Sequence, residues 1–246
     1  MEHQTIKDAV DITQRAQRNY DLSKSIPQAD LDTLIYTALN SPSKQNETHF
    51  NLKVYTDTNL IHNIYDCTKR FGLYTEEYFN KMFKDTDKGV IGNNKYEVKN
   101  SQVLANVVFV YCDEDQQDED NLRGSEQIIA NRGNASEETT NFFTRLKNFS
   151  IGISSGQLSL VAALLGYKTG FCSGYSTSQL KAVIKDEPRL LVGIGYENID
   201  KDRRLHGILF NKDIPKQYRT GEDNEHWRFP SFDKKIKIDI NNERRN

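Results

Sequence analysis

Basic side chains at two places in the chain could hold a phosphate group. Arg15 and Arg18 stand near the end of a predicted N-terminal helix, whereas Lys201, Arg203 and Arg204 follow a predicted strand. A guanidinium group offers planar, paired donors that match the oxygens of a phosphate. Either group alone is more typical of a solvated surface, so a phosphate site is a hypothesis that needs both groups.

Two loops carry groups that could contact a flat heteroaromatic ring. The amide of Asn46 can donate and accept hydrogen bonds at once, which suits a ring edge with mixed donors and acceptors. Ser173 and Gly174 lie in a glycine-rich turn, where backbone N–H groups can approach a ligand. Taken singly, the asparagine is more typical of a turn or helix cap, and the turn of a simple chain reversal. These groups become informative only in combination.

Several other chemistries are disfavoured by the sequence. Cys67, Cys112 and Cys172 are far apart and show no ligand spacing with histidine, so we expect reduced thiols and no metal site. There is no G-x-G-x-x-G fingerprint after a strand, no P-loop and no nucleophile elbow. The net charge of −2 argues against a nucleic-acid partner.

Length and hydropathy bound the organisation of the chain. Its 246 residues favour a single domain, 1–246, with residues 113–134 as a polar insertion or lid and 211–246 as a C-terminal extension. No apolar run approaches the ~18 residues of a membrane span, and the first residues lack a signal-peptide core. We therefore expect a cytoplasmic protein with no membrane partner.

One stretch, Ser150–Ser176, is expected to position these groups. Ile151, Leu158 and Leu165 follow a helical spacing, while glycine, serine and alanine occupy most of the intervening positions. Such a helix should be covered on all sides, because almost no bulky or charged side chain interrupts it. We predict that it ends at Gly166 and leads into the glycine-rich turn.

Other elements are predicted from apolar periodicity. The first helix, Thr5–Arg18, should place Ile6 and Val10 inward. The continuous apolar run at 103–114 is typical of a central strand. Helices are further predicted at 27–39, from about 136 and at 178–184, and residues 59–84 should form two helices or one helix broken near Gly72. Strands are predicted at 51–57, 189–197 and 234–240, the last an edge strand.

Read in order, the motifs resemble the nitroreductase superfamily of FMN-dependent oxidoreductases. The family's Arg-Arg-Ser-x-Arg-x-Phe run is similar to QRAQRNY, in which Gln14 replaces the first arginine and Ala16 the serine. Its Pro-Ser-x-x-Asn run is similar to Pro42, Ser43 and Asn46, without the Gln-Pro-Trp end of the family pattern.

Two later motifs extend the resemblance. A helix that ends in Leu-Gly before a glycine turn is similar to Leu165 and Gly166 followed by Cys172-Ser173-Gly174, and an Ile-Gly-Tyr strand end before basic residues is similar to 194–204. The resemblance implies that FMN is contacted by Arg15, Ala16, Arg18, Pro42, Ser43, Asn46, Cys172, Ser173, Gly174, Lys201, Arg203 and Arg204.

The resemblance also implies a fold and an activity. The fold would be α+β, with a mixed, mainly antiparallel central sheet wrapped by helices, in an intertwined homodimer with FMN at the interface. The activity would be hydride transfer from NADH or NADPH through flavin N5 to an electron-poor acceptor such as a nitroaromatic or quinone, with no catalytic side chain. A flavin-fragmenting or other oxygen-dependent enzyme, or a non-catalytic protein that binds flavin or a partner, stays open as an alternative.

Overall fold

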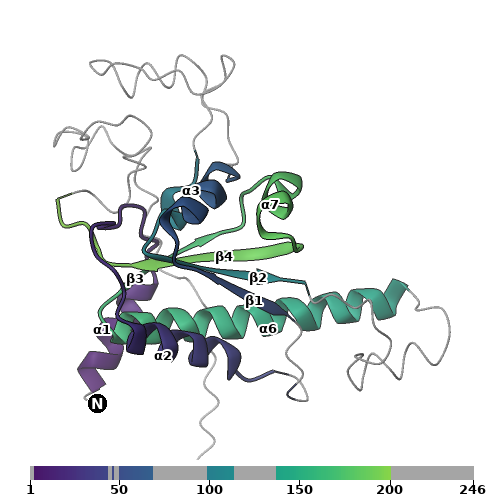
Figure 1. The fold of residues 1–246 in the computed structure, drawn as a ribbon. Coiled ribbons are helices and arrows are strands. Elements are labelled where there is room, and N and C mark those ends of the chain that lie inside the picture. Colours follow the sequence, from purple (N-terminus) through teal and green to yellow (C-terminus); the bar gives the residue numbers. More distant parts are fainter. Residues whose placement is uncertain (1–2, 44–45, 47–49, 69–98, 114–136, 201–246) are drawn as a thin grey trace, which may run out of the picture.

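The computed structural model describes residues 3–43, 46, 50–68, 99–113 and 137–200 (Figure 1). Its helices are α1 (His3–Thr13), α2 (Gln28–Leu39), α3 (Thr58–Asp66), η2 (Ser101–Val103, a 3-10 turn), α6 (Glu137–Leu164) and α7 (Thr177–Ile184). Its strands are β1 (Asn51–Tyr55), β2 (Val107–Cys112), β3 (Lys168–Cys172) and β4 (Pro188–Gly195).

The strands form one antiparallel sheet in the order β1-β2-β4-β3. Every residue of β2 is buried, as expected for the predicted central strand. The strand begins at Val107 rather than Val103, because Ser101–Val103 form the 3-10 turn, capped by the Asn100 side chain accepting from the Gln102 N–H. The predicted α+β class is confirmed.

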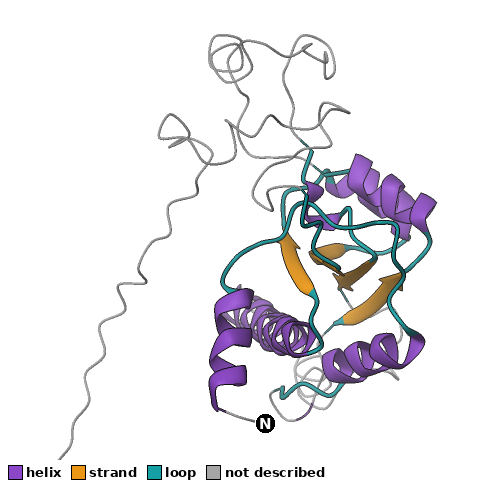
Figure 2. Ribbon diagram, turned by 90° about the vertical axis from the view of Figure 1, so that its left-hand side faces the viewer, coloured by secondary structure: helices purple, strands orange, loops and turns teal. Residues whose placement is uncertain are grey.

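Helices cover both faces of the sheet. In Figures 1 and 2, α1, α2 and α6 lie on one side of the strands and α3 and α7 on the other. Alternate residues of β2 serve the two layers: Phe109 and Tyr111 pack with α2 and α6, while Val108 and Val110 pack with α3 and α7. The apolar run is continuous because both faces of this strand are covered.

The described residues cover helix α6 on one face only. Leu158 and Ala162 are fully buried against the sheet, whereas Gly152 and Gly156 are exposed, with no atom within 4 Å of a built Cβ. Leu165, expected inside, is 37% exposed. The prediction of a helix covered on all sides is therefore wrong for the single chain.

Helix α1 is also turned differently from the expectation. Ile6 and Val10 are each 43% exposed, and the buried residue is Ala9. The helix packs against α6 and β3 through its small side chain, which allows close approach but leaves its two large apolar residues outside. The inward orientation predicted for Ile6 and Val10 is wrong within one chain.

Several predicted segments fall outside the described residues. These are most of the helical segment predicted at 59–84 after Thr68, the insertion at 114–134, the extension at 211–246 and the strand at 234–240. None of the helices in the described ranges combines the length and apolar character of a membrane span.

A buried hydroxyl pair joins α6 to α2 and β2. Ser154 Oγ donates to Ala38 O at 2.7 Å and hydrogen-bonds Tyr111 Oη at 3.0 Å, so the tyrosine is the donor of the second bond. Ser154→Ala should lower the free energy of unfolding by about 1–3 kcal/mol, because the buried Tyr111 hydroxyl loses its partner and Ala38 O keeps only its bond from Ser41 Oγ.

Chemical denaturation of the variant measures this loss, with the exposed Ser178→Ala as control. In the Ser154→Ala background, Tyr111→Phe should recover part of the stability by removing the unpaired hydroxyl. A double variant that is less stable than Ser154→Ala would contradict this account.

Candidate functional site

The segment after α1 runs along strand β3. The Gln17 N–H donates to Thr169 O at 2.8 Å. A Cβ at Gly170 would lie 2.6 Å from Gln17 O and 2.9 Å from Tyr20 Oη, so a side chain there would push the segment away. Glycine at this position is therefore required by the close approach of the two backbones.

A buried tyrosine anchors this segment. Tyr20 Oη lies 3.2 Å from Gln102 O and 3.1 Å from Gly193 O, and the residue is 5% exposed. Burial raises the pKa of Tyr20 above its ordinary value, against a smaller opposite effect of the Arg18 charge. The hydroxyl therefore stays protonated, and its one proton is shared between two carbonyl groups.

Asn106 holds the chain that follows β4. Its Nδ2 donates to Asp21 O at 2.9 Å and Lys24 O at 2.6 Å, and its Oδ1 accepts from the Tyr196 N–H at 3.0 Å. A Cβ at Gly195 would lie 1.9 Å from that Oδ1, so only glycine leaves room for the amide. One side chain thus fixes the segment before α2 and the end of β4 relative to each other.

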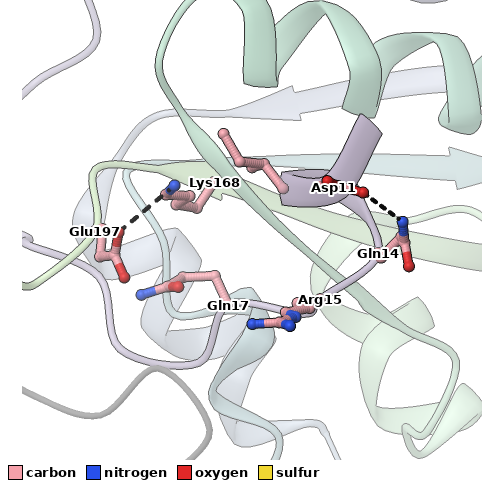
Figure 3. Close-up of a pocket in the computed structure, with 7 residues that line it drawn as sticks. Asp11, Gln14, Arg15, Gln17, Lys168 and Glu197 are labelled. Carbon is pink, nitrogen blue, oxygen red and sulfur yellow. Dashed lines mark hydrogen bonds and ion pairs between the residues drawn. The ribbon is translucent and has the colours of Figure 1, made fainter. Parts of the chain in front are cut away.

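A pocket of about 420 Å³ opens between these segments (Figure 3). Its walls come from the end of α1, the following segment, the start of β3 and the chain after β4. The lining residues are Asp11, Ile12, Gln14, Arg15, Gln17, Lys168 and Glu197.

The pocket carries two positive and two negative side chains. Lys168 Nζ lies 3.6 Å from Glu197 Oε2. The Gln14 Nε2 donates to Asp11 Oδ1 at 3.0 Å. Arg15 is exposed and forms no ion pair with any residue that the structure describes. A guanidinium at the rim is thus available to an anionic ligand.

A buried acceptor also lines the pocket. Gln17 is 1% exposed, and its Nε2 donates to Asn19 O. Its Oε1 is buried without a hydrogen-bond partner among the described residues. A buried amide oxygen without a donor costs about 1–3 kcal/mol. A ligand with both an anionic group and hydroxyl donors, such as the ribityl phosphate of FMN, fits these residues.

Two of the predicted contact groups lie along strand β3, one beside its start and the other after its end. Arg15, Ala16 and Arg18 lie on the segment beside β3, and β3 leads directly to Ser173 and Gly174. Ala16 and Arg18 are half-buried, Ser173 is exposed, and Gly174 is buried.

The Cys172 side chain is turned away from solvent. The residue is 1% exposed, its Sγ donates to Gly174 O at 3.5 Å, and burial raises the pKa of its thiol to about 11. A neutral thiol in this position shapes the turn, so the predicted flavin contact at Cys172 is one that its backbone could make.

The predicted contact residues of the Pro-Ser-x-x-Asn motif lie in another part of the single chain. Pro42 is exposed, Ser43 is half-buried, and Asn46 is exposed with a left-handed φ of 59°, all in the loop between α2 and β1. That loop leads into β1 at Asn51, which pairs with Cys112 of β2. Cys112 in turn pairs with Pro188, so the loop joins the sheet near the start of β4. Lys168 pairs instead with Gly195, at the end of β4. One chain therefore does not bring Asn46 to Arg15, and Lys201, Arg203 and Arg204 lie outside the described residues.

A sequence profile of the nitroreductase family matches residues 13–196. The chain belongs to the nitroreductase family. This confirms the resemblance found in the motifs, and with it the predicted class of protein, an FMN-using oxidoreductase. No curated protein sequence matches the chain.

Solved structures of nitroreductase-family proteins share the fold. A Bacillus subtilis nitroreductase, NfrA1, is 13% identical, with a TM-score of 0.53 over 91% of this chain and 78% of that one. A proposed NAD(P)H:FMN oxidoreductase of Staphylococcus epidermidis is 15% identical, with a TM-score of 0.52 over 79% and 88% of the two chains. A proposed nitroreductase of Exiguobacterium sibiricum, solved with FMN, is 18% identical, with a TM-score of 0.50 over 78% and 88%.

Four pocket residues of this nitroreductase-family chain, Asp11, Gln17, Lys168 and Glu197, were not singled out from the sequence. Gln17 lies between the two predicted contact arginines, where nothing marks its side chain as buried. Lys168 and Glu197 are neighbours only because β3 and β4 pair with Lys168 opposite Gly195. The sequence alone does not reveal that register. A lysine at the first position of a strand is the one signal that could have suggested Lys168 as a binding residue.

Gly170→Ala should destabilise the fold by about 1–3 kcal/mol, because the added methyl group meets backbone atoms that cannot move independently. Thermal or chemical unfolding gives the measurement. The matched control is Gly152→Ala, in which the same methyl group meets no atom of its own chain within a helix, and it should destabilise by less than Gly170→Ala. Equal effects of the two substitutions would show that the segment after α1 leaves room for a side chain at Gly170.

Proposed function

We propose that this protein binds FMN in the pocket beside β3 and uses it to oxidise NADH or NADPH and reduce an electron-poor acceptor, such as a nitroaromatic or quinone. When bound, FMN supplies the redox chemistry, taking a hydride at N5 and passing electrons to the acceptor. The observation that carries the proposal is the pocket itself, which joins a rim arginine and a buried acceptor in a chain of this family.

The role of the protein's own residues is to bind FMN and orient it. We assign Arg15 at the rim to the phosphate, and Arg18, half-buried near Tyr20, to the ring. The backbone at Ser173 and Gly174 continues from β3 and offers N–H donors to a ring edge. No side chain is required as an acid or base, and the Cys172 thiol, with a pKa of about 11, stays neutral near pH 7.

A second copy of the chain would complete the site. The loop that carries Ser43 and Asn46 enters the sheet at the end opposite to Lys168, so a site that uses both needs another subunit. The uncovered face of α6 offers a surface for it, since Phe149 is 63% and Ile153 47% exposed beside two open glycines. A homodimer that buries this face is the assembly we propose.

The absorbance spectrum of protein mixed with FMN, before and after NADPH under nitrogen, tests the activity. We expect a bound flavin whose visible band bleaches on addition of NADPH and returns when a quinone is added. A bound flavin that stays oxidised with both NADH and NADPH would favour the non-catalytic alternative. Irreversible loss of the band in air would favour flavin fragmentation.

Gly156→Arg tests the assembly. The side chain meets open space in the single chain, so folding should be retained, but a long cation would block a neighbouring helix. Light scattering should show a dimer for the unchanged protein and a monomer for this variant. Gly156→Ala is the matched control and should stay dimeric. A dimer that survives Gly156→Arg would place the interface elsewhere.

A further inference from the structure

An ion pair at the pocket joins the first residue of β3 to the chain after β4. Lys168 pairs in register with Gly195, two residues before Glu197, and its Nζ lies 3.6 Å from Glu197 Oε2. The side chains are 25% and 37% exposed. An ion pair of this length and exposure is weak. Lys168 can therefore change partners when a stronger anion arrives.

The pocket has a neutral residue where the family pattern carries a cation. Gln14 stands at the first arginine of that pattern, and its amide is engaged by Asp11 at 3.0 Å. On the segment after α1, only Arg15 then brings a positive charge to the pocket lining. Lys168 adds a second positive charge from a different element, on the same pocket.

The buried acceptor of Gln17 points to the part of the ligand that lies here. Its Oε1 is buried without a hydrogen-bond partner among the described residues, and Gln17 lines the pocket together with Lys168. A ribityl chain carries hydroxyl donors next to a phosphate, so one ligand tail can serve both the amide oxygen and the cations. The faces of a flavin ring offer no donor to this oxygen, and the N3–H donor on the ring edge lies far from the phosphate that the cations would bind.

We propose that Lys168 is a phosphate-binding residue for FMN in this chain, and that it leaves Glu197 to do so. Arg15 holds the phosphate from the other wall of the pocket (Figure 3). This assignment rests on the proposed function. Lys168 supplies the charge that Gln14 does not.

Titration of FMN and riboflavin, followed by flavin fluorescence, tests the assignment because only FMN has the phosphate. Lys168→Gln should raise the Kd for FMN about tenfold, the size expected for a lost hydrogen bond between charged groups. Its Kd for riboflavin should change by less than about twofold, and Lys168→Arg should keep most of the FMN affinity. Glu197→Gln should lower the Kd for FMN, since it frees Lys168 and removes a negative charge near the phosphate.

Lys181→Gln is the matched control. Lys181 also pairs with a glutamate, Glu187, at 3.1 Å, but it lies on α7 and outside the pocket. This variant should bind both flavins like the unchanged protein. Unchanged FMN binding by Lys168→Gln, or an equal loss for FMN and riboflavin, would overturn the role of Lys168 and leave the proposed function intact. Failure of the unchanged protein to bind FMN would overturn both.

Discussion

The backbone pairing of the segment between α1 and α2 is the constraint on which the rest of the site depends. Tyr20 and Glu197 form an isolated antiparallel bridge, and Gln17 is hydrogen-bonded to Thr169. The segment therefore lies across the ends of β3 and β4 like an additional short strand, pinned by one buried hydroxyl. Arg15 and Gln17 owe their places in the pocket to this pairing rather than to any helix.

The parts of the fold that follow from hydrophobic burial could be read from the sequence. The apolar run of β2 predicts a central strand because both faces of that strand are covered, and β4 follows the same logic. Helix α7 begins within one residue of its predicted start. The motifs indicated the family that the profile match confirms, because the order of motifs along the chain carries information that single residues lack.

The errors come from contacts that pattern alone does not specify. Ile6 and Val10 have helical spacing, but spacing gives the width of an apolar face and not the element that covers it. The small residues of α6 predict close packing without saying whether the neighbour is in the same chain. Lys168 and Glu197 meet through strand register, which depends on the whole sheet. These errors concern a partner, whereas the late start of β2 at Val107 and the early end of α1 at Thr13 concern the bounds of an element.

The loop with Asn46 and the segment with Arg15 occupy opposite ends of the sheet, and this separation has a genetic meaning. In a homodimer built as proposed, each site combines one end of one chain with the other end of its partner. Two chains with defects at different ends would then form a mixed dimer in which one site carries both defects and the other carries none. Alleles that are inactive alone could complement each other in the same cell, with half of the sites restored in each mixed dimer.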